Sequence, residues 1–158
     1  MISKTATTCL LLAAASLAWA LADDDEAKAL PDGPGKELVG KVCIDCHSAE
    51  SFRKQRFSED EWWDKVGEMV DKGAKADQAE QAEIVAYLVR HFGPGSKVRV
   101  NTAPENEVTV VLGFTADESK ALVAYRADHG AFKDWSEVAK VPGVDAKKVE
   151  GQKDKMAF

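Results

Sequence analysis

Apolar positions in the first half of the chain recur with the spacing of an amphipathic helix. Between residues 58 and 73 they fall at i, i+4, i+7 and i+8, which places them on one helix face. Ser58 followed by Glu61 forms a capping box that starts this helix, and Gly73 is placed to end it. We expect the apolar face to point inward, and it consists of Trp62, Val66, Met69 and Val70.

A second apolar stripe predicts the helix that follows. Asp77 and Glu80 provide the start signal, and the turn residues at 93–95 end the pattern. Both helices belong to one small helical module in the first half of the chain. The stripe of the second helix consists of Ile84, Tyr87, Leu88 and either His91 or Phe92.

The second half of the chain contains an internal repeat with an offset of thirty residues. Residues 108–116 align with residues 138–146. Each copy reads as a helix end, a glycine turn and a capping residue that opens a new helix. The capping box is complete in the first copy and incomplete in the second. The repeat predicts a double helix-hairpin-helix.

Every element that these patterns predict is a helix, so we expect an all-α fold with domains at residues 23–95 and 96–158. The charge is distributed unevenly between them. Residues 23–95 hold 17 acidic and 10 basic side chains, whereas residues 96–158 hold 10 of each. The whole 158-residue chain has a net charge of −6, which argues against general affinity for nucleic acid.

The first 22 residues have the layout of a secretory signal. Lys4 gives a positive start, an apolar run follows from residue 10, and small residues at 20 and 22 precede an acidic segment. The apolar run is too short for a comfortable membrane span. We therefore predict cleavage after Ala22, an exported or periplasmic protein, and no membrane span in the mature chain.

Cys43, Cys46 and His47 bring two thiols and an imidazole into five residues. A structural zinc site needs four ligands, and the mature chain has no third cysteine. A redox dithiol or a plain disulfide would give the histidine no role. Covalent haem uses all three side chains, because Cys-x-x-Cys-His is the attachment motif of c-type haem and the histidine then binds iron. We expect one covalently attached haem c.

The segment before this motif resembles the first helix of class I cytochromes c. Residues 35–42 lead into Cys43, with a glycine eight residues before that cysteine. In that family the glycine permits close contact with an aromatic residue on the last helix. The resemblance assigns these two roles to Gly35 and Tyr87.

The second iron ligand decides between an electron carrier and an open haem site. Met69, His91 and Met156 are the candidates. Residues 62–74 resemble minimal cytochrome c domains, whose methionine ligand lies in the context Trp-x(6)-Met-x(3)-Gly-Ala. That resemblance favours Met69, with His47 as the opposite ligand. A methionine on an apolar helix face also serves as core filler.

With both ligands in place, the expected function is electron transfer and not enzymatic catalysis. An exported monohaem cytochrome c would pass single electrons between periplasmic redox proteins, and its acidic surface would favour a partner with a basic docking face. If Met69 does not bind iron, the alternative is a haem enzyme or gas sensor with an open distal site.

The second half resembles the competence-type helix-hairpin-helix DNA-binding domain and the extrinsic photosystem II subunit with that fold. The resemblance covers residues 98–155 and rests on segments 100–103 and 125–132 as well as on the repeat. DNA-binding hairpins usually read Gly-x-Gly, whereas here the second glycine is Thr115 or Asp145. We therefore expect a protein-docking module, with DNA binding or DNA tethering as the alternative.

Overall fold

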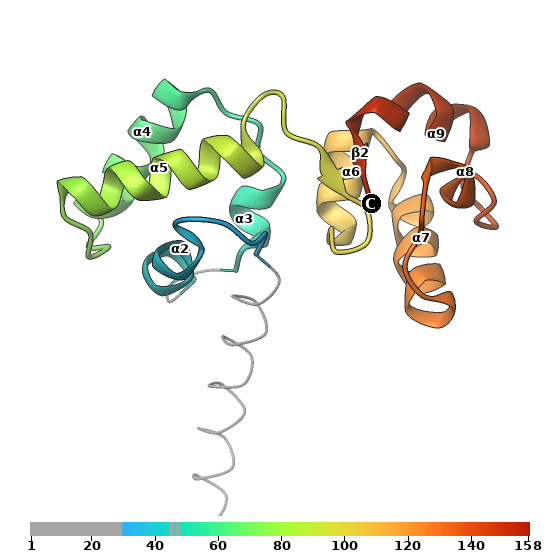
Figure 1. Ribbon diagram of the computed structural model, residues 1–158, viewed down its shortest axis with the longest axis horizontal. Helices are drawn as coiled ribbons and strands as arrows, with labels where there is room; N and C mark the ends of the chain where they lie inside the picture. The colour runs from blue at the N-terminus through green and yellow to red at the C-terminus, as the bar shows by residue number, and fades with distance from the viewer. Residues whose placement is uncertain (1–29, 45, 47) are drawn as a thin grey trace, which may run out of the picture.

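The structure is a computed structural model that describes residues 30–44, 46 and 48–158. The predicted signal segment, residues 1–22, lies outside the described residues. Within them the chain forms two groups of helices, joined by the segment that runs from α5 to β1 (Figure 1). The predicted all-α class is confirmed. No helix among these residues has both the length and the apolar character needed to cross a membrane.

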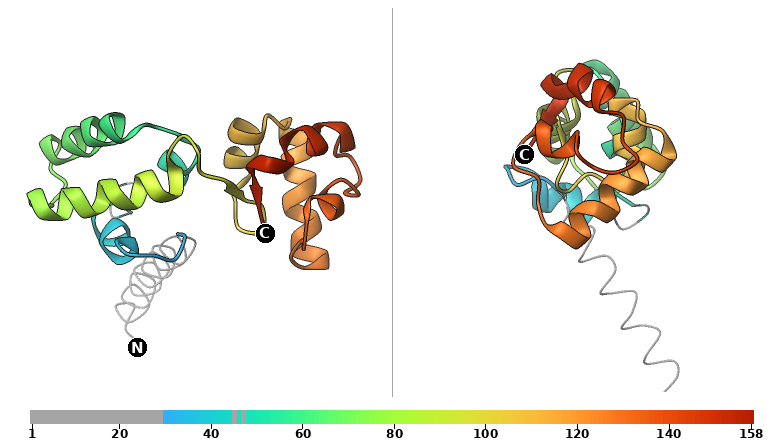
Figure 2. Two further views of the ribbon diagram at one scale, coloured as in Figure 1. Left: turned by 45° about the horizontal axis from the view of Figure 1, so that its top comes forward. Right: turned by 90° about the vertical axis from the view of Figure 1, so that its right-hand side faces the viewer.

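The first group of helices follows the local signals of the sequence. Capping boxes at Ser58 and Asp77 are present, each closed by the glutamate three residues later. Helices α4 and α5 pack against each other, and α2 packs against α5 (Figure 2). The helices are α2 (Lys36–Cys43), α3 (Glu50–Arg53), α4 (Glu59–Asp71) and α5 (Gln78–Phe92).

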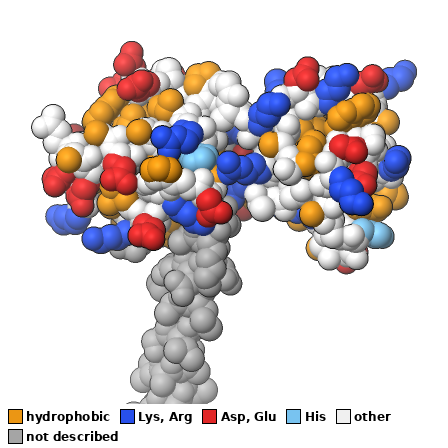
Figure 3. Space-filling view, in the orientation of Figure 1, with side chains coloured by type: hydrophobic (Ala, Val, Ile, Leu, Met, Phe, Trp, Pro, Cys, Tyr) orange, Lys and Arg blue, Asp and Glu red, His pale blue; other side chains and the backbone are white. Residues whose placement is uncertain are grey.

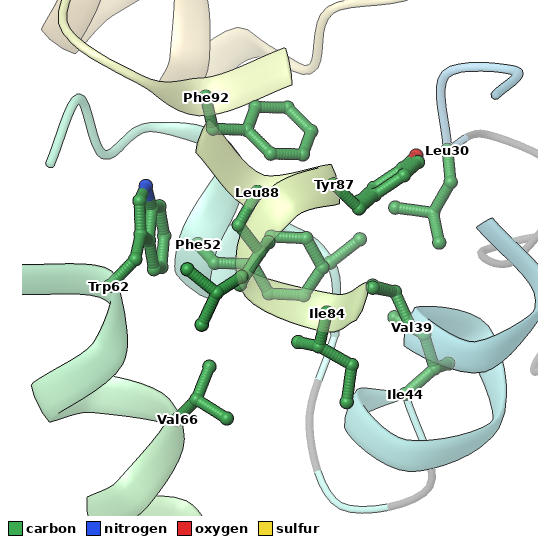
Figure 4. Close-up of a cluster of buried hydrophobic side chains, with 12 residues drawn as sticks. Leu30, Val39, Ile44, Phe52, Trp62, Val66, Ile84, Tyr87, Leu88 and Phe92 are labelled. Carbon is green, nitrogen blue, oxygen red and sulfur yellow. The ribbon is translucent and has the colours of Figure 1, made fainter. Parts of the chain in front are cut away.

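A continuous apolar core lies between these helices (Figure 4). Trp62 and Val66 point into it as predicted, because they occupy the inner face of α4. Met69 does not belong to the core and is only half-buried, so the expectation that it points inward is wrong. The core consists of Leu30, Val39, Ile44, Ala49, Phe52, Trp62, Val66, Ile84, Val85, Tyr87, Leu88 and Phe92.

Gly35 lies directly against the last helix of this group. A Cβ at Gly35 would stand 2.9 Å from Tyr87 Cβ, and the residue has a positive φ of 91°. The Tyr87 hydroxyl donates a 2.7 Å hydrogen bond to the carbonyl of Pro31 and so fixes the segment before Gly35. The predicted contact between Gly35 and Tyr87 is confirmed.

The second group of helices is closed by a two-stranded parallel sheet that pairs its two ends. β1 (Val98–Arg99) pairs with β2 (Met156–Ala157), and Val98 lies opposite Met156. Between the strands lie α6 (Glu105–Leu112), α7 (Ala116–His129), α8 (Trp135–Val138), α9 (Ala146–Gln152) and the 3-10 helix η1 (Lys153–Lys155).

The core of this second group is separate from the first. Met156, one of the three candidate iron ligands, is 3% exposed and packs in it. Asn101 ties the start of the group to its middle: the amide of Phe132 donates to Asn101 Oδ1 at 2.7 Å, and Asn101 Nδ2 donates to the Phe132 carbonyl at 2.9 Å. Arg126 donates to the carbonyls of Val100 and Ala103. Segments 100–103 and 125–132, on which the resemblance to the helix-hairpin-helix domain rests, are therefore connected by hydrogen bonds that stabilise the fold.

A buried ion cluster joins the two groups. Arg53 Nε, on α3, lies 3.1 Å from Glu107 Oε2, on α6, and Arg56 NH2 lies 3.0 Å from Glu107 Oε1. Arg53 also donates a 3.2 Å hydrogen bond to the carbonyl of Thr102. The side chains of Arg53 and Glu107 are only 4% and 3% exposed. A buried ion pair therefore connects the two helical groups.

Candidate nucleic-acid interface

The first hairpin, residues 112–116, connects α6 to α7. Gly113 ends α6 in the left-handed region, with φ 70° and ψ 25°. Thr115 caps α7, because its side chain accepts a hydrogen bond from the amide of Glu118 while the Glu118 carboxylate accepts one from the amide of Thr115. Gly113 is exposed, and a Cβ at this position would meet nothing within 4 Å. The turn therefore presents its backbone to solvent.

The second hairpin, residues 142–146, repeats this geometry between α8 and α9. Gly143 has φ 88° and is exposed, like Gly113 thirty residues earlier. Asp145 caps α9 and accepts a 2.9 Å hydrogen bond from the amide of Lys147. The repeat predicted from the sequence is therefore confirmed, because both hairpins have a left-handed glycine followed by a residue that caps the next helix.

One carboxylate holds the two hairpins together. Glu118 Oε2 accepts the amide of Thr115 at 2.7 Å, and Glu118 Oε1 accepts the amide of Asp145 at 3.2 Å. Lys148, the counterpart of Glu118 in the repeat, forms an ion pair with the same carboxylate. The Lys148 hydrogen bond is the main cause that lowers the pKa of Glu118 to about 2. The hairpins are therefore adjacent and rigidly related.

Protonation of Glu118 is expected to lower the thermal stability of the protein at acid pH. Because the pKa of Glu118 is about 2 in the folded chain against an ordinary 4.5, its stabilisation is complete above pH 4.5 and disappears as the pH falls through about 2. Melting curves from pH 7 to pH 2 should show a steeper loss for wild type than for Glu118→Gln.

Glu68→Gln provides the matched control for this pH series. The pKa of Glu68 is also lowered to about 2, by Lys65 and Lys72, but all three side chains lie on the exposed surface of the first group. Solvent screening leaves such pairs a small effect. If Glu68→Gln flattens the acid profile as much as Glu118→Gln does, the bridging role of Glu118 is wrong.

The missing second glycine of each hairpin does not prevent the turn. Thr115 and Asp145 have φ values of −69° and −74°, which any residue adopts. Asp145 also turns its carboxylate back to the start of α9, where it accepts the amide of Lys147. The argument against DNA binding from these two substitutions therefore fails, because only Gly113 and Gly143 need the left-handed conformation.

Hydrogen-bond donors and positive charges are available beside both hairpins. The capping box uses the amides of Thr115 and Glu118, which leaves those of Ala116 and Asp117 without a partner from their own helix. Exposed lysines flank the turns and form no ion pair within the described part of the chain. These lysines are Lys120, Lys140 and Lys147.

The residues that the sequence pointed to as a haem site lie in the other helical group. Cys43 ends α2 and is half-buried, and Cys46 is exposed; both are free thiols. Burial raises the pKa of Cys43 to about 11, with a smaller contribution from Cys46, so its thiol is neutral near pH 7. His47 lies outside the described residues. Met69 is half-buried on α4, and His91 packs beside Tyr87 with ring centroids 4.5 Å apart.

Comparisons with known proteins match the second helical group. The family model of the helix-hairpin-helix motif covers residues 93–156. ComE operon protein 1 of Bacillus subtilis (strain 168) is 24% identical over 115 residues, which is 55% of this chain and 56% of that protein. The chain thus spans little more than half the length of this relative. An uncharacterized protein of Haemophilus influenzae is 32% identical over 85 residues, 51% of this chain and 76% of that protein. No solved structure matches.

These comparisons contradict the interpretation of the chain as an electron carrier. The matched family is a helix-hairpin-helix family, and no match reported above is to a cytochrome. Among residues 30–44, 46 and 48–158, no three His, Cys, Asp or Glu side chains are grouped to hold a metal ion. The expected haem c and the expected redox partners are therefore wrong, and so is the expectation that nucleic acid is an unlikely partner.

The haem interpretation was wrong because the cysteine motif that suggested it is much shorter than the hairpin repeat. The cysteine motif spans five residues, and a motif of that size is only a hypothesis until its surroundings support it. The helix-hairpin-helix signal, in contrast, covers residues 93–156, which include a complete hydrophobic core and the helix caps around it. The chain belongs to the same family as the Haemophilus influenzae protein, and its second half is a helix-hairpin-helix domain.

Proposed function

We propose that this protein binds duplex DNA, without sequence preference, through the two hairpins of its second half. The observation that carries the proposal is the bridge made by Glu118, which holds both turns side by side with their glycines exposed. Two adjacent turns can contact two phosphates of one DNA backbone. Contacts to phosphate position a protein on DNA but carry no direct sequence information.

Backbone amides would supply the phosphate contacts. The amides at the start of α7 point out of the helix, where its dipole favours an anion. The exposed Gly113 lets a phosphate approach closely, because no Cβ stands in the way. Lys120, Lys140 and Lys147 would add attraction over a longer range, and binding should therefore weaken as salt rises.

The uneven charge of the chain would limit contact to the hairpin domain. Residues 96–158 are neutral overall, whereas residues 23–95 have seven more acidic than basic side chains. DNA would be repelled by the first group of helices and accepted by the hairpins. Such a protein acts by binding and not as an enzyme.

The proposed place of action is outside the cytoplasm. The first 22 residues have the layout of a secretory signal. The similarity to ComE operon protein 1 is consistent with an exported or membrane-associated protein.

Fluorescence anisotropy with a labelled 25-base-pair duplex tests the proposal. Lys147→Glu should weaken binding roughly tenfold and make it less sensitive to salt, because a phosphate contact beside the second hairpin is lost. Lys147 is exposed at the start of α9, where a glutamate suits the helix dipole and the fold should persist.

Lys75→Glu is the matched control, because it changes the net charge equally on an exposed site of the first helical group. It should leave the affinity within about twofold. Two results would contradict the proposal: no binding of the wild-type protein at low salt, or an equal loss of affinity in both variants.

A further inference from the structure

A small pocket lies where the two helical groups meet, away from the hairpin turns. We call it the junction pocket; its polar lining consists mainly of Arg53, Arg90, His91, Lys97, Arg99 and Glu107. Its volume is about 110 Å³. Pockets for organic ligands are roughly 300 Å³ or more, so this one suits a single compact group.

The lining has more positive charge than its acidic groups neutralise. Glu107 is already engaged by Arg53 and Arg56. Asp32, the other carboxylate near Arg99, lies 2.8 Å from Lys36 Nζ. Three cationic side chains of the lining, Arg90, Lys97 and Arg99, make no ion pair within the described part of the chain. Figure 3 shows basic side chains gathered at this junction.

The positive charge of Arg99 affects the pKa values of three nearby side chains. Burial raises the pKa of Tyr87 and lowers that of His91, both on α5; the charge of Arg99 opposes the first shift and adds to the second. The pKa of Asp32 is lowered mainly by Lys36, with a smaller contribution from Arg99. Among the described residues, the buried Nε2 atom of His91 has no hydrogen-bond partner. The positive field and the guanidinium groups of Arg90 and Arg99 together favour a compact anion, because the planar guanidinium group matches the oxygens of phosphate and carboxylate.

We propose that the junction pocket binds a phosphate group, held by Arg90, Lys97 and Arg99 with Arg53 at its base. The buried ion pair of Arg53 and Glu107 gives the pocket a rigid floor. Arg90, Lys97 and Arg99 provide the positive charge. The pocket is made by both helical groups at once. A bound phosphate would therefore also favour their attachment to each other, since binding stabilises the state that contains the site.

The phosphate could come from solution or from a DNA backbone, and these sources share one chemistry. This proposal does not depend on DNA binding by the hairpins. If the source is DNA, the duplex would also reach the basic junction pocket, and the acidic surface of the first group would then not confine DNA to the hairpins. If the source is a free phosphate, the pocket would act independently of the hairpins.

The test uses the full chain, inorganic phosphate and the labelled duplex. Arg90→Gln with Arg99→Gln removes two positive charges from the junction pocket, and Lys140→Gln with Lys147→Gln removes two beside the hairpins. All four side chains are exposed, and a melting curve checks the fold of each variant. Phosphate is titrated by calorimetry and followed through the imidazole signals of His91 by NMR.

We expect the pocket variant to bind inorganic phosphate at least tenfold more weakly than wild type, and the hairpin variant to bind it normally. Unchanged DNA affinity in the pocket variant would identify free phosphate as the source. A reduced DNA affinity with a smaller salt dependence would identify DNA as the source. The proposal is overturned if wild type binds no phosphate, or if both variants lose phosphate binding equally. Failure of the hairpins to bind DNA would leave the phosphate titration unaffected.

Discussion

Glu107→Gln is expected to destabilise the folded protein by about 3 kcal/mol, because it removes the buried carboxylate that pairs with both Arg53 and Arg56. Arg53 is 4% exposed at the side chain and has Glu107 as its carboxylate partner at 3.1 Å. The glutamine has the same size, so the packing of α6 is preserved and the loss of charge is isolated. Urea unfolding followed by tryptophan fluorescence and circular dichroism measures the difference.

Glu105→Gln is the control for this experiment. Glu105 lies on the same helix but is exposed, and its replacement should change the free energy of unfolding by less than about 0.5 kcal/mol. The double variant Arg53→Met with Glu107→Leu should recover most of the loss, because an apolar pair can replace a buried ion pair. Equal stability of Glu107→Gln and wild type would show that Arg53 is adequately satisfied by other groups.

The same variant should also loosen the attachment of the two helical groups. Each group has a core of its own, and the ion cluster is the buried polar link between α3 and α6. Wild type is expected to unfold in one transition seen by both probes. Because Trp135 packs in the second group, the comparison is made in a Trp135→Phe background, where the tryptophans within the described residues are Trp62 and Trp63 of the first group. In Glu107→Gln on this background the tryptophan signal and the helical signal of the whole chain should no longer coincide.

Local signals in the sequence were sufficient to place most helices. The capping boxes at Ser58, Asp77 and Thr115 are each complete in the structure, because both partners lie within three residues. The glycine turns at 113 and 143 were also recognised, since the left-handed conformation leaves glycine as the ordinary choice.

Contacts between distant residues could not be read in this way. Arg53 and Glu107 are 54 positions apart, and each looks like an ordinary surface charge within its own helix. The strands β1 and β2 have two residues each, which is too short for an alternating pattern. For Met69 the local pattern predicted a core contact that the structure lacks. The apolar stripe of α4 extends to Met69, yet Val66 is the last residue of that helix in the core.

The helix-hairpin-helix module was recognised from the sequence, but its role was weighed incorrectly against that of the cysteine motif. Composition describes a neutral domain, whereas the proposed interface depends on where the exposed lysines and the amides at the helix starts lie. The loss of a second glycine suggested a blocked hairpin. The sequence marked Thr115 and Asp145 as capping residues, but it did not show that both have an ordinary φ and that only Gly113 and Gly143 need the left-handed conformation. The side chains of Thr115 and Asp145 bond back to the starts of α7 and α9.

Gly35→Ala is expected to destabilise the protein by about 3 kcal/mol, since two unfavourable effects combine. The φ of 91° is a conformation that alanine adopts only with strain. The new Cβ would also stand 2.9 Å from Tyr87 Cβ and 3.2 Å from the carbonyl oxygen of Glu83. Because the backbone of α5 is fixed by its own hydrogen bonds, α2 would have to move away from α5.

Gly67→Ala separates this clash from the general effect of adding a methyl group. Gly67 lies within α4, and a Cβ there would meet nothing within 4 Å. Alanine is the better helix former, so this variant should be more stable than wild type by about 0.5–1 kcal/mol. Opposite signs for the two variants in urea unfolding would establish that α2 touches α5 at Gly35. A Gly35→Ala variant as stable as wild type would mean that this contact is looser than 2.9 Å implies, and that the packing of the first helical group does not depend on it.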